Sequence, residues 1–114
     1  MEFNKSNVLK TIKIEAIGAF GDGWSQIKQF APAEFEKMAI QLVTISKNVA
    51  LYKIDRSTGY SVATGKALLR MQRTAMESVF VAISALVIVT IQNAINAIFR
   101  VLKATFATAL RAVL

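Results

Sequence analysis

The sequence predicts an all-α protein with a short N-terminal helix, an amphipathic helix over residues 32–54 and one long apolar C-terminal helix. Three observations predict this class. Apolar residues recur at spacings of three and four in both halves of the chain. One short segment alternates as a strand would, but no other segment offers it a partner strand. No glycine or proline follows Gly65 to interrupt a helix.

The composition is that of one ordered domain with few of the groups used in catalysis. Of the 114 residues, 54% are hydrophobic, and the mean hydropathy is +0.46, which is unlike a disordered chain. Cysteine and histidine are both absent. Their absence removes disulfides, thiolate metal sites and the commonest general base. The acidic residues are scattered, so we expect no enzyme activity, no metal and no cofactor.

Positive charge is concentrated in the second half of a chain whose net charge is +7. Residues 1–55 contain seven basic and six acidic residues, whereas residues 56–114 contain seven basic residues and only Glu77 as an acid. We expect the first range to form an amphipathic helical region and the second a basic, apolar helical region. This imbalance favours anionic lipid as a partner. Nucleic acid is the weaker alternative, because the basic residues are spread thinly and form no dense patch.

Residues 5–20 are expected to form the first, short helix. Its apolar face holds Leu9, Ile12, Ala16 and Phe20. A glycine-rich turn follows, and Trp24 comes directly after it. A tryptophan in this position either covers the end of a small core or anchors the chain at a membrane interface. We favour the first interpretation.

Residues 32–54 form the clearest amphipathic helix, because Pro32 suits a first helical turn and Glu34 suits the positive end of the helix dipole. Apolar residues then recur at spacings of 3, 4, 3, 4 and 3, which we call the seam: Phe35, Met38, Leu42, Ile45, Val49 and Tyr52. This pattern predicts packing against another helix. The partner is either a helix of the same chain or one of another subunit.

One long helix is expected after the turn at residues 55–59, running from about Tyr60 towards the C-terminus. A capping box at Thr74 and Glu77 offers a possible new start there. Residues 78–99 carry no formal charge, and as a helix they would extend about 33 Å, enough to cross a hydrocarbon core of about 30 Å. We therefore interpret residues 78–99 as a candidate transmembrane span.

Two sets of residues on this long helix are candidate contact sites. Small and polar residues are expected to form an oligomer interface, because buried amides need hydrogen-bond partners: Ala82, Ala85, Val89, Gln92, Asn93 and Asn96. Basic residues on both sides of the span are expected to anchor it at lipid headgroups: Arg70, Arg73, Arg100, Lys103 and Arg111.

These features predict a small helical structural subunit of an oligomeric membrane-spanning, virion or secretion assembly, located in a membrane or cell envelope. Its expected partners are copies of itself, anionic membrane lipid and other assembly subunits. One alternative is a pore former of the holin or toxin kind, which would use the same helix to permeabilise a bilayer. A further alternative is a soluble helical adaptor with a buried C-terminal helix.

Overall fold

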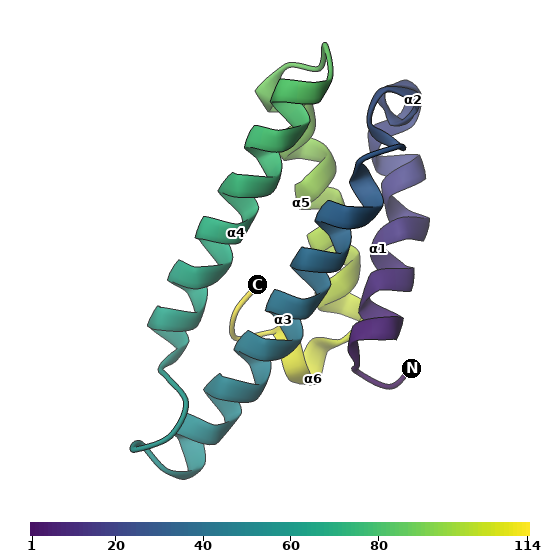
Figure 1. Cartoon of the computed structure of the whole chain (residues 1–114). Helices are drawn as coiled ribbons and strands as arrows, with labels where there is room; N and C mark the ends of the chain where they lie inside the picture. Colours follow the sequence, from purple (N-terminus) through teal and green to yellow (C-terminus); the bar gives the residue numbers. More distant parts are fainter.

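The computed structural model describes all 114 residues and contains helices and turns but no strand, so the all-α prediction is confirmed (Figure 1). The long helices are α1 (Lys5–Phe20), α3 (Ala31–Ile54), α4 (Val62–Ile83) and α5 (Ile88–Thr105). Three short elements complete the fold: the 3₁₀ turn η1 (Gly21–Gly23), α2 (Trp24–Ile27) and α6 (Ala107–Leu110).

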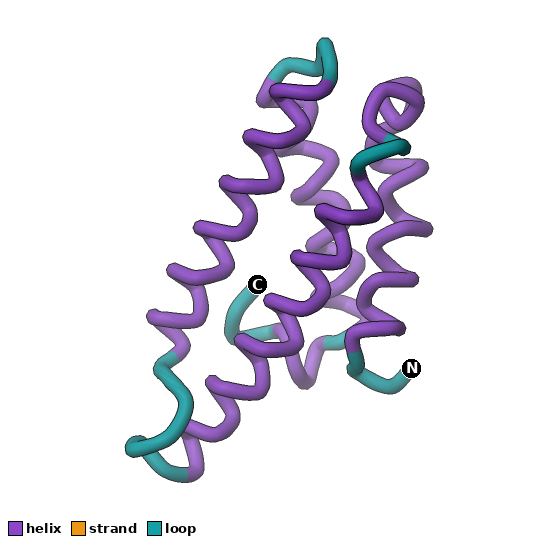
Figure 2. The backbone as a smooth tube through the Cα atoms, viewed as in Figure 1, coloured by secondary structure: helices purple, strands orange, loops and turns teal.

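The four long helices form a bundle, and loops separate them only at its ends (Figure 2). Helix α1 packs against both α3 and α5, while α4 packs mainly against α3. Both α3–α4 and α4–α5 are antiparallel hairpins, so their connecting turns lie at opposite ends of α4 (Figure 1). One hydrophobic core contains residues from both halves of the chain.

Helix α1 begins at a side-chain cap, because Asn4 Oδ1 accepts a hydrogen bond from the Asn7 backbone N–H over 2.8 Å. The helix buries one face against α3 and α5. Its buried apolar residues repeat every fourth position: Val8, Ile12, Ala16 and Phe20. The helix predicted over residues 5–20 is therefore present, and the strand alternative is not.

The seam of α3 faces the interior of its own chain. Five of its six residues are buried, and Tyr52 is half-buried near the end of the helix. Phe35 packs edge to face on Phe80 of α4, with ring centroids 5.9 Å apart, and stacks with Trp24 at 6.4 Å. Trp24 is half-buried, so it covers one end of the core as expected.

The prediction of one long C-terminal helix is wrong. Helix α4 ends at Ile83 and α5 begins at Ile88, so the charge-free segment 78–99 is divided between two antiparallel helices. Side chains replace the helical hydrogen bonds in the break. The Ala85 backbone N–H donates to Gln26 Oε1 over 2.8 Å, and the Leu86 N–H donates to Ser84 Oγ over 3.2 Å.

This break also changes the membrane interpretation of residues 78–99. Reversal of the chain lets Phe80 and Ile91, one on each helix, both be fully buried in the core. No helix of the structure combines the length and the apolar character that crossing a bilayer requires. The predicted transmembrane span is therefore not supported.

Candidate functional site

A cleft of about 440 Å³ lies between the N-terminal half of α4, α5 and the end of the chain. Its cations come from α4 at spacings of four and three, which places Lys66, Arg70 and Arg73 on one side of that helix. The rest of its lining is apolar: Leu69, Phe99, Val113 and Leu114. We call this the basic cleft.

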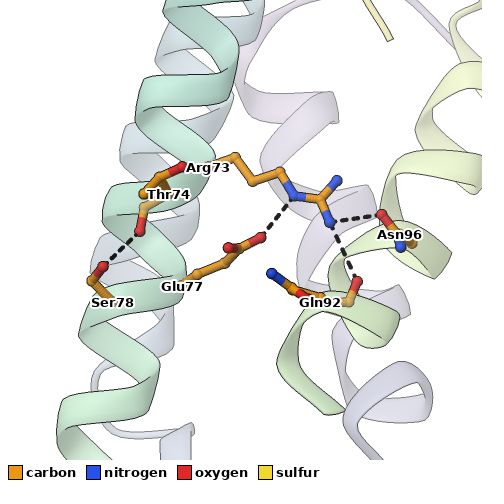
Figure 3. Close-up of polar contacts among 6 residues, drawn as sticks. All are labelled: Arg73, Thr74, Glu77, Ser78, Gln92 and Asn96. Atoms are coloured by element: carbon orange, nitrogen blue, oxygen red, sulfur yellow. Dashed lines mark hydrogen bonds and ion pairs between the residues drawn. The ribbon is translucent and has the colours of Figure 1, made fainter. Parts of the chain in front are cut away.

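Arg73 is the one cation of the basic cleft that is held in place (Figure 3). Its Nε donates to Glu77 Oε1 over 2.8 Å, and its Nη2 donates to Asn96 Oδ1 over 2.7 Å. Nη2 also approaches the Gln92 carbonyl oxygen at 3.4 Å, and the guanidinium lies 5.4 Å from the centre of the Phe99 ring. Arg73 therefore links α4 to α5.

Lys66 and Arg70 differ from Arg73, because both are exposed and neither forms an ion pair. They stand at the rim of a cleft in which Leu69 and Val113 are 6% and 5% exposed. Two free positive charges over an apolar floor suit a ligand that has both a negative group and an apolar part.

A second cleft of about 460 Å³, with a more polar lining, lies between the end of α3 and residues 107–112. Its lining contains Lys53 from the end of α3 and Arg111 from the turn after α6, together with Ala107, Thr108 and Ala112. Residues 107–114 thus contribute to both clefts. Cations of α3, α4 and the C-terminal segment therefore line two clefts that share the segment 107–114.

The α3–α4 turn carries an exposed apolar residue among these charges. Ile54 is 85% exposed, and Lys53 and Arg56 on either side of it are exposed and form no ion pair. Leu51, one turn earlier on α3, is 40% exposed. Asp55 is the only acid of this turn. We call residues 51–56 the hairpin tip.

Two ionisable groups of the α3–α4 turn have shifted pKa values. Ser57 donates both its backbone N–H and its hydroxyl to Asp55 Oδ1, over 2.9 and 2.8 Å, and these hydrogen bonds lower the pKa of Asp55. Burial raises the pKa of Tyr60, partly offset by a hydrogen bond with the Asn48 side chain. Both shifts have local causes in this turn, the hydrogen bonds from Ser57 and the burial of Tyr60.

The predicted membrane anchors divide between the clefts and open surface. Arg70 and Arg73 line the basic cleft, and Arg111 lines the second cleft. Arg100 and Lys103 are exposed on α5 and line neither. A role of any of them at lipid headgroups stays a prediction.

The predicted oligomer interface is not one face of a single helix, because the break at residues 84–87 separates its members. Ala82 lies near the end of α4, Ala85 lies in the break, and the other four residues lie on α5. All are exposed except Gln92, which is half-buried. Their contact with another subunit stays a prediction.

Sequence reasoning missed the exposed apolar side chain of Ile54 and the place of Lys53 and Lys66 in the clefts. A signal for Ile54 existed, since Lys47, Leu51 and Ile54 recur at helical spacing on the side of α3 away from the seam. Phe99 and Val113 join the basic cleft only through the tertiary fold, so no local pattern marks them.

The structure contains no group of three or more acidic, cysteine or histidine side chains that could hold a metal ion. No protein-family model, curated protein or solved structure matches this chain.

Proposed function

We propose that this protein is a non-catalytic helical subunit that lies on an anionic membrane surface and contacts the lipid peripherally through its hairpin tip. One observation carries the proposal. Ile54, an apolar side chain that is 85% exposed, stands between two cations that have no acidic partner, Lys53 and Arg56. Exposed apolar side chains combined with cations are typical of proteins that bind the membrane interface.

The energetics of such a contact come from both kinds of side chain. Each lysine or arginine near an anionic membrane surface contributes about 1 kcal/mol. Lys53 and Arg56 flank the tip, and Lys66 and Arg70 lie on the neighbouring part of α4. Burial of Ile54 and Leu51 among the headgroups would add the hydrophobic term. Several small terms together give measurable binding where a single one would not.

The opposite end of α4 supports the assembly part of the proposal. Three consecutive apolar residues there, Val87, Ile88 and Val89, are 63%, 42% and 58% exposed. Consecutive exposed apolar residues favour contact with a protein partner, in keeping with the expected self-association. With one end on lipid, the other end would be free to meet a neighbouring subunit.

Flotation of the full chain with phospholipid vesicles tests the membrane contact. We expect binding to vesicles of phosphatidylcholine with 30% phosphatidylglycerol and at least tenfold weaker binding to pure phosphatidylcholine. Ile54→Glu should reduce binding to the anionic vesicles at least tenfold. Ile14→Glu is the matched control, because Ile14 is 60% exposed on α1 and the charge change is the same.

Equal losses from Ile54→Glu and Ile14→Glu would contradict the proposed contact, because net charge alone would then explain the binding. Circular dichroism of both variants checks that the helices remain. Release of a dye from the same vesicles would instead support the pore-forming alternative.

A further inference from the structure

We propose that the basic cleft binds one anionic amphiphile, a molecule with a carboxylate or phosphate head and an apolar chain. The inference rests on the proposed function for the source of this ligand, a lipid of the anionic surface. Three features of the cleft support this ligand: free cations at the rim, one fixed cation inside and an apolar floor.

The rim of the cleft attracts the head of the ligand. Lys66 and Arg70 are exposed, lie one helical turn apart and form no ion pair. The three ion pairs of the molecule are Lys5–Glu36, Lys37–Glu34 and Arg73–Glu77. No carboxylate side chain is among the lining residues of the cleft, and the terminal carboxylate of Leu114 forms no ion pair with Lys66 or Arg70. A bound anion would therefore meet two unpaired positive charges at the rim.

Arg73 gives the head of the ligand a fixed partner. Glu77 and Asn96 hold its Nε and Nη2 atoms, while its Nη1 atom has no hydrogen-bond partner within the protein. An arginine already held in one orientation loses little conformational freedom when it binds a carboxylate or phosphate oxygen. The contact with Asn96 that links α4 to α5 thus also holds a donor at the cleft.

The floor of the cleft suits an apolar chain better than a bare ion. Four of its seven lining residues are apolar: Leu69 and Val113 form a nearly buried base, and the half-buried Phe99 and Leu114 present accessible apolar surface. A volume of about 440 Å³ lies within the range of small-molecule sites, roughly 300–1,000 Å³. Inorganic phosphate would leave this apolar floor in contact with water, whereas an alkyl chain would cover it.

Isothermal titration calorimetry with the full chain tests the ligand class, with every amphiphile kept below its micelle concentration. We expect dodecyl phosphate and dodecanoate to bind with one molecule per chain. Inorganic phosphate tests the head alone, and dodecyl maltoside tests the chain without a charge. Each of these two probes should bind at least tenfold more weakly than dodecyl phosphate.

Variants locate the binding site. The double variant Lys66→Ala with Arg70→Ala should lower the affinity for dodecyl phosphate at least tenfold. The matched control is Lys10→Ala with Lys13→Ala, which removes two exposed cations from α1 and should change nothing. Leu114→Ser removes part of the apolar lining, so it should weaken the binding of dodecyl phosphate and leave the weak binding of inorganic phosphate unchanged.

The inference would be overturned by equal affinity for inorganic phosphate and dodecyl phosphate, by the absence of saturable binding, or by an unaffected double variant. Its failure is distinguishable from failure of the proposed function. Binding of dodecyl phosphate without binding of anionic vesicles supports the cleft and rejects the membrane contact, making a free amphiphile the ligand. Vesicle binding that depends on Ile54, without binding of dodecyl phosphate, rejects the ligand proposed for the cleft and supports the membrane contact.

Discussion

Arg73 and Asn96 lie on antiparallel helices and are joined by a hydrogen bond of 2.7 Å, from Arg73 Nη2 to Asn96 Oδ1 (Figure 3). The sequence assigns these residues to different sites, Arg73 to a membrane anchor and Asn96 to an oligomer interface. The side-chain oxygen of Asn96 has a polar partner, and its own chain supplies it. Folding of α5 back along α4 makes this contact possible.

Removal of the Arg73 guanidinium should destabilise the fold. Arg73→Met keeps the apolar stem but leaves the Glu77 side chain, which is 11% exposed, without its ion-pair partner. We expect the free energy of unfolding to fall by about 1–3 kcal/mol, measured by urea denaturation. Arg70→Met is the control, because Arg70 is exposed and unpaired, and it should change stability by less than about 0.5 kcal/mol. Equal effects of the two variants would argue against the Arg73–Glu77 pair.

Burial of the α3 seam leads to a second prediction about stability. Leu42 is fully buried at its centre, so Leu42→Ala should lower the free energy of unfolding by about 2–5 kcal/mol. Leu51→Ala on the same helix is the control, since Leu51 is 40% exposed. A loss under about 0.5 kcal/mol for Leu42→Ala would show that this face is not packed in solution.

The seam could be predicted from sequence because its burial follows from helical periodicity alone. The same periodicity could not predict the break between α4 and α5. The break contains no glycine or proline, and it depends on Gln26, a side chain 59 residues away that accepts the Ala85 N–H. Leu86 also packs against Gly23, another distant residue. Ser84, whose Oγ accepts the Leu86 N–H, is a local part of this break, whereas the contacts of Gln26 and Gly23 leave no local pattern.

The charge-free segment 78–99 is ambiguous in sequence, because an apolar run suits either a membrane span or two buried helix faces. Phe80 and Ile91 are both fully buried, whereas Val87 between them is 63% exposed. An apolar turn residue between two amphipathic helices looks, in sequence, like part of one continuous apolar run. The spacing of Lys66, Arg70 and Arg73 was visible, but the residues that face them across the basic cleft were not.

Gly59 is expected to be intolerant of substitution. Its φ is +59°, and a Cβ at this position would collide with the backbone carbonyl oxygen of Asn48. Gly59→Ala should therefore lower the free energy of unfolding by about 1–3 kcal/mol, seen as a lower thermal midpoint. Gly18→Ala is the control, because Gly18 lies inside α1 and a Cβ there meets nothing within 4 Å. It should raise stability by about 0.5–1 kcal/mol. The reverse order of midpoints would contradict this account.

Self-association is expected at the α4–α5 turn. Single cysteines introduced at Ala82, Ala85 and Val89, which are all exposed, should form disulfide-linked dimers under mild oxidation. A cysteine at Ser6, exposed near the start of α1, is the matched control and should not. Light scattering should show a mass above that of one 12.5 kDa chain. A monomeric mass together with equal cross-linking at all four positions would reject this interface.

The charge of Asp55 should oppose binding to anionic vesicles. Its carboxylate is the only acid of the hairpin tip, so Asp55→Asn removes that charge and keeps an oxygen that can accept from Ser57. One unit of charge near an anionic surface changes binding by about 1 kcal/mol, or roughly fivefold. We expect Asp55→Asn to bind the phosphatidylglycerol vesicles about fivefold more tightly at pH 7, in the same flotation assay.

The pH dependence of the wild-type chain provides an independent check. The hydrogen bonds from Ser57 lower the pKa of Asp55 below its ordinary value of 3.8, so the folded chain keeps this carboxylate ionised down to that pH. The stability that these hydrogen bonds contribute is present above pH 3.8 and is lost as the pH falls through the lowered pKa. Vesicle binding should therefore be constant between about pH 5 and 7, because the phosphate head also stays ionised.

Asp22→Asn is the matched control for Asp55→Asn, because Asp22 lies at the opposite end of the bundle. If it tightened binding as much as Asp55→Asn, total charge rather than the hairpin tip would control the contact.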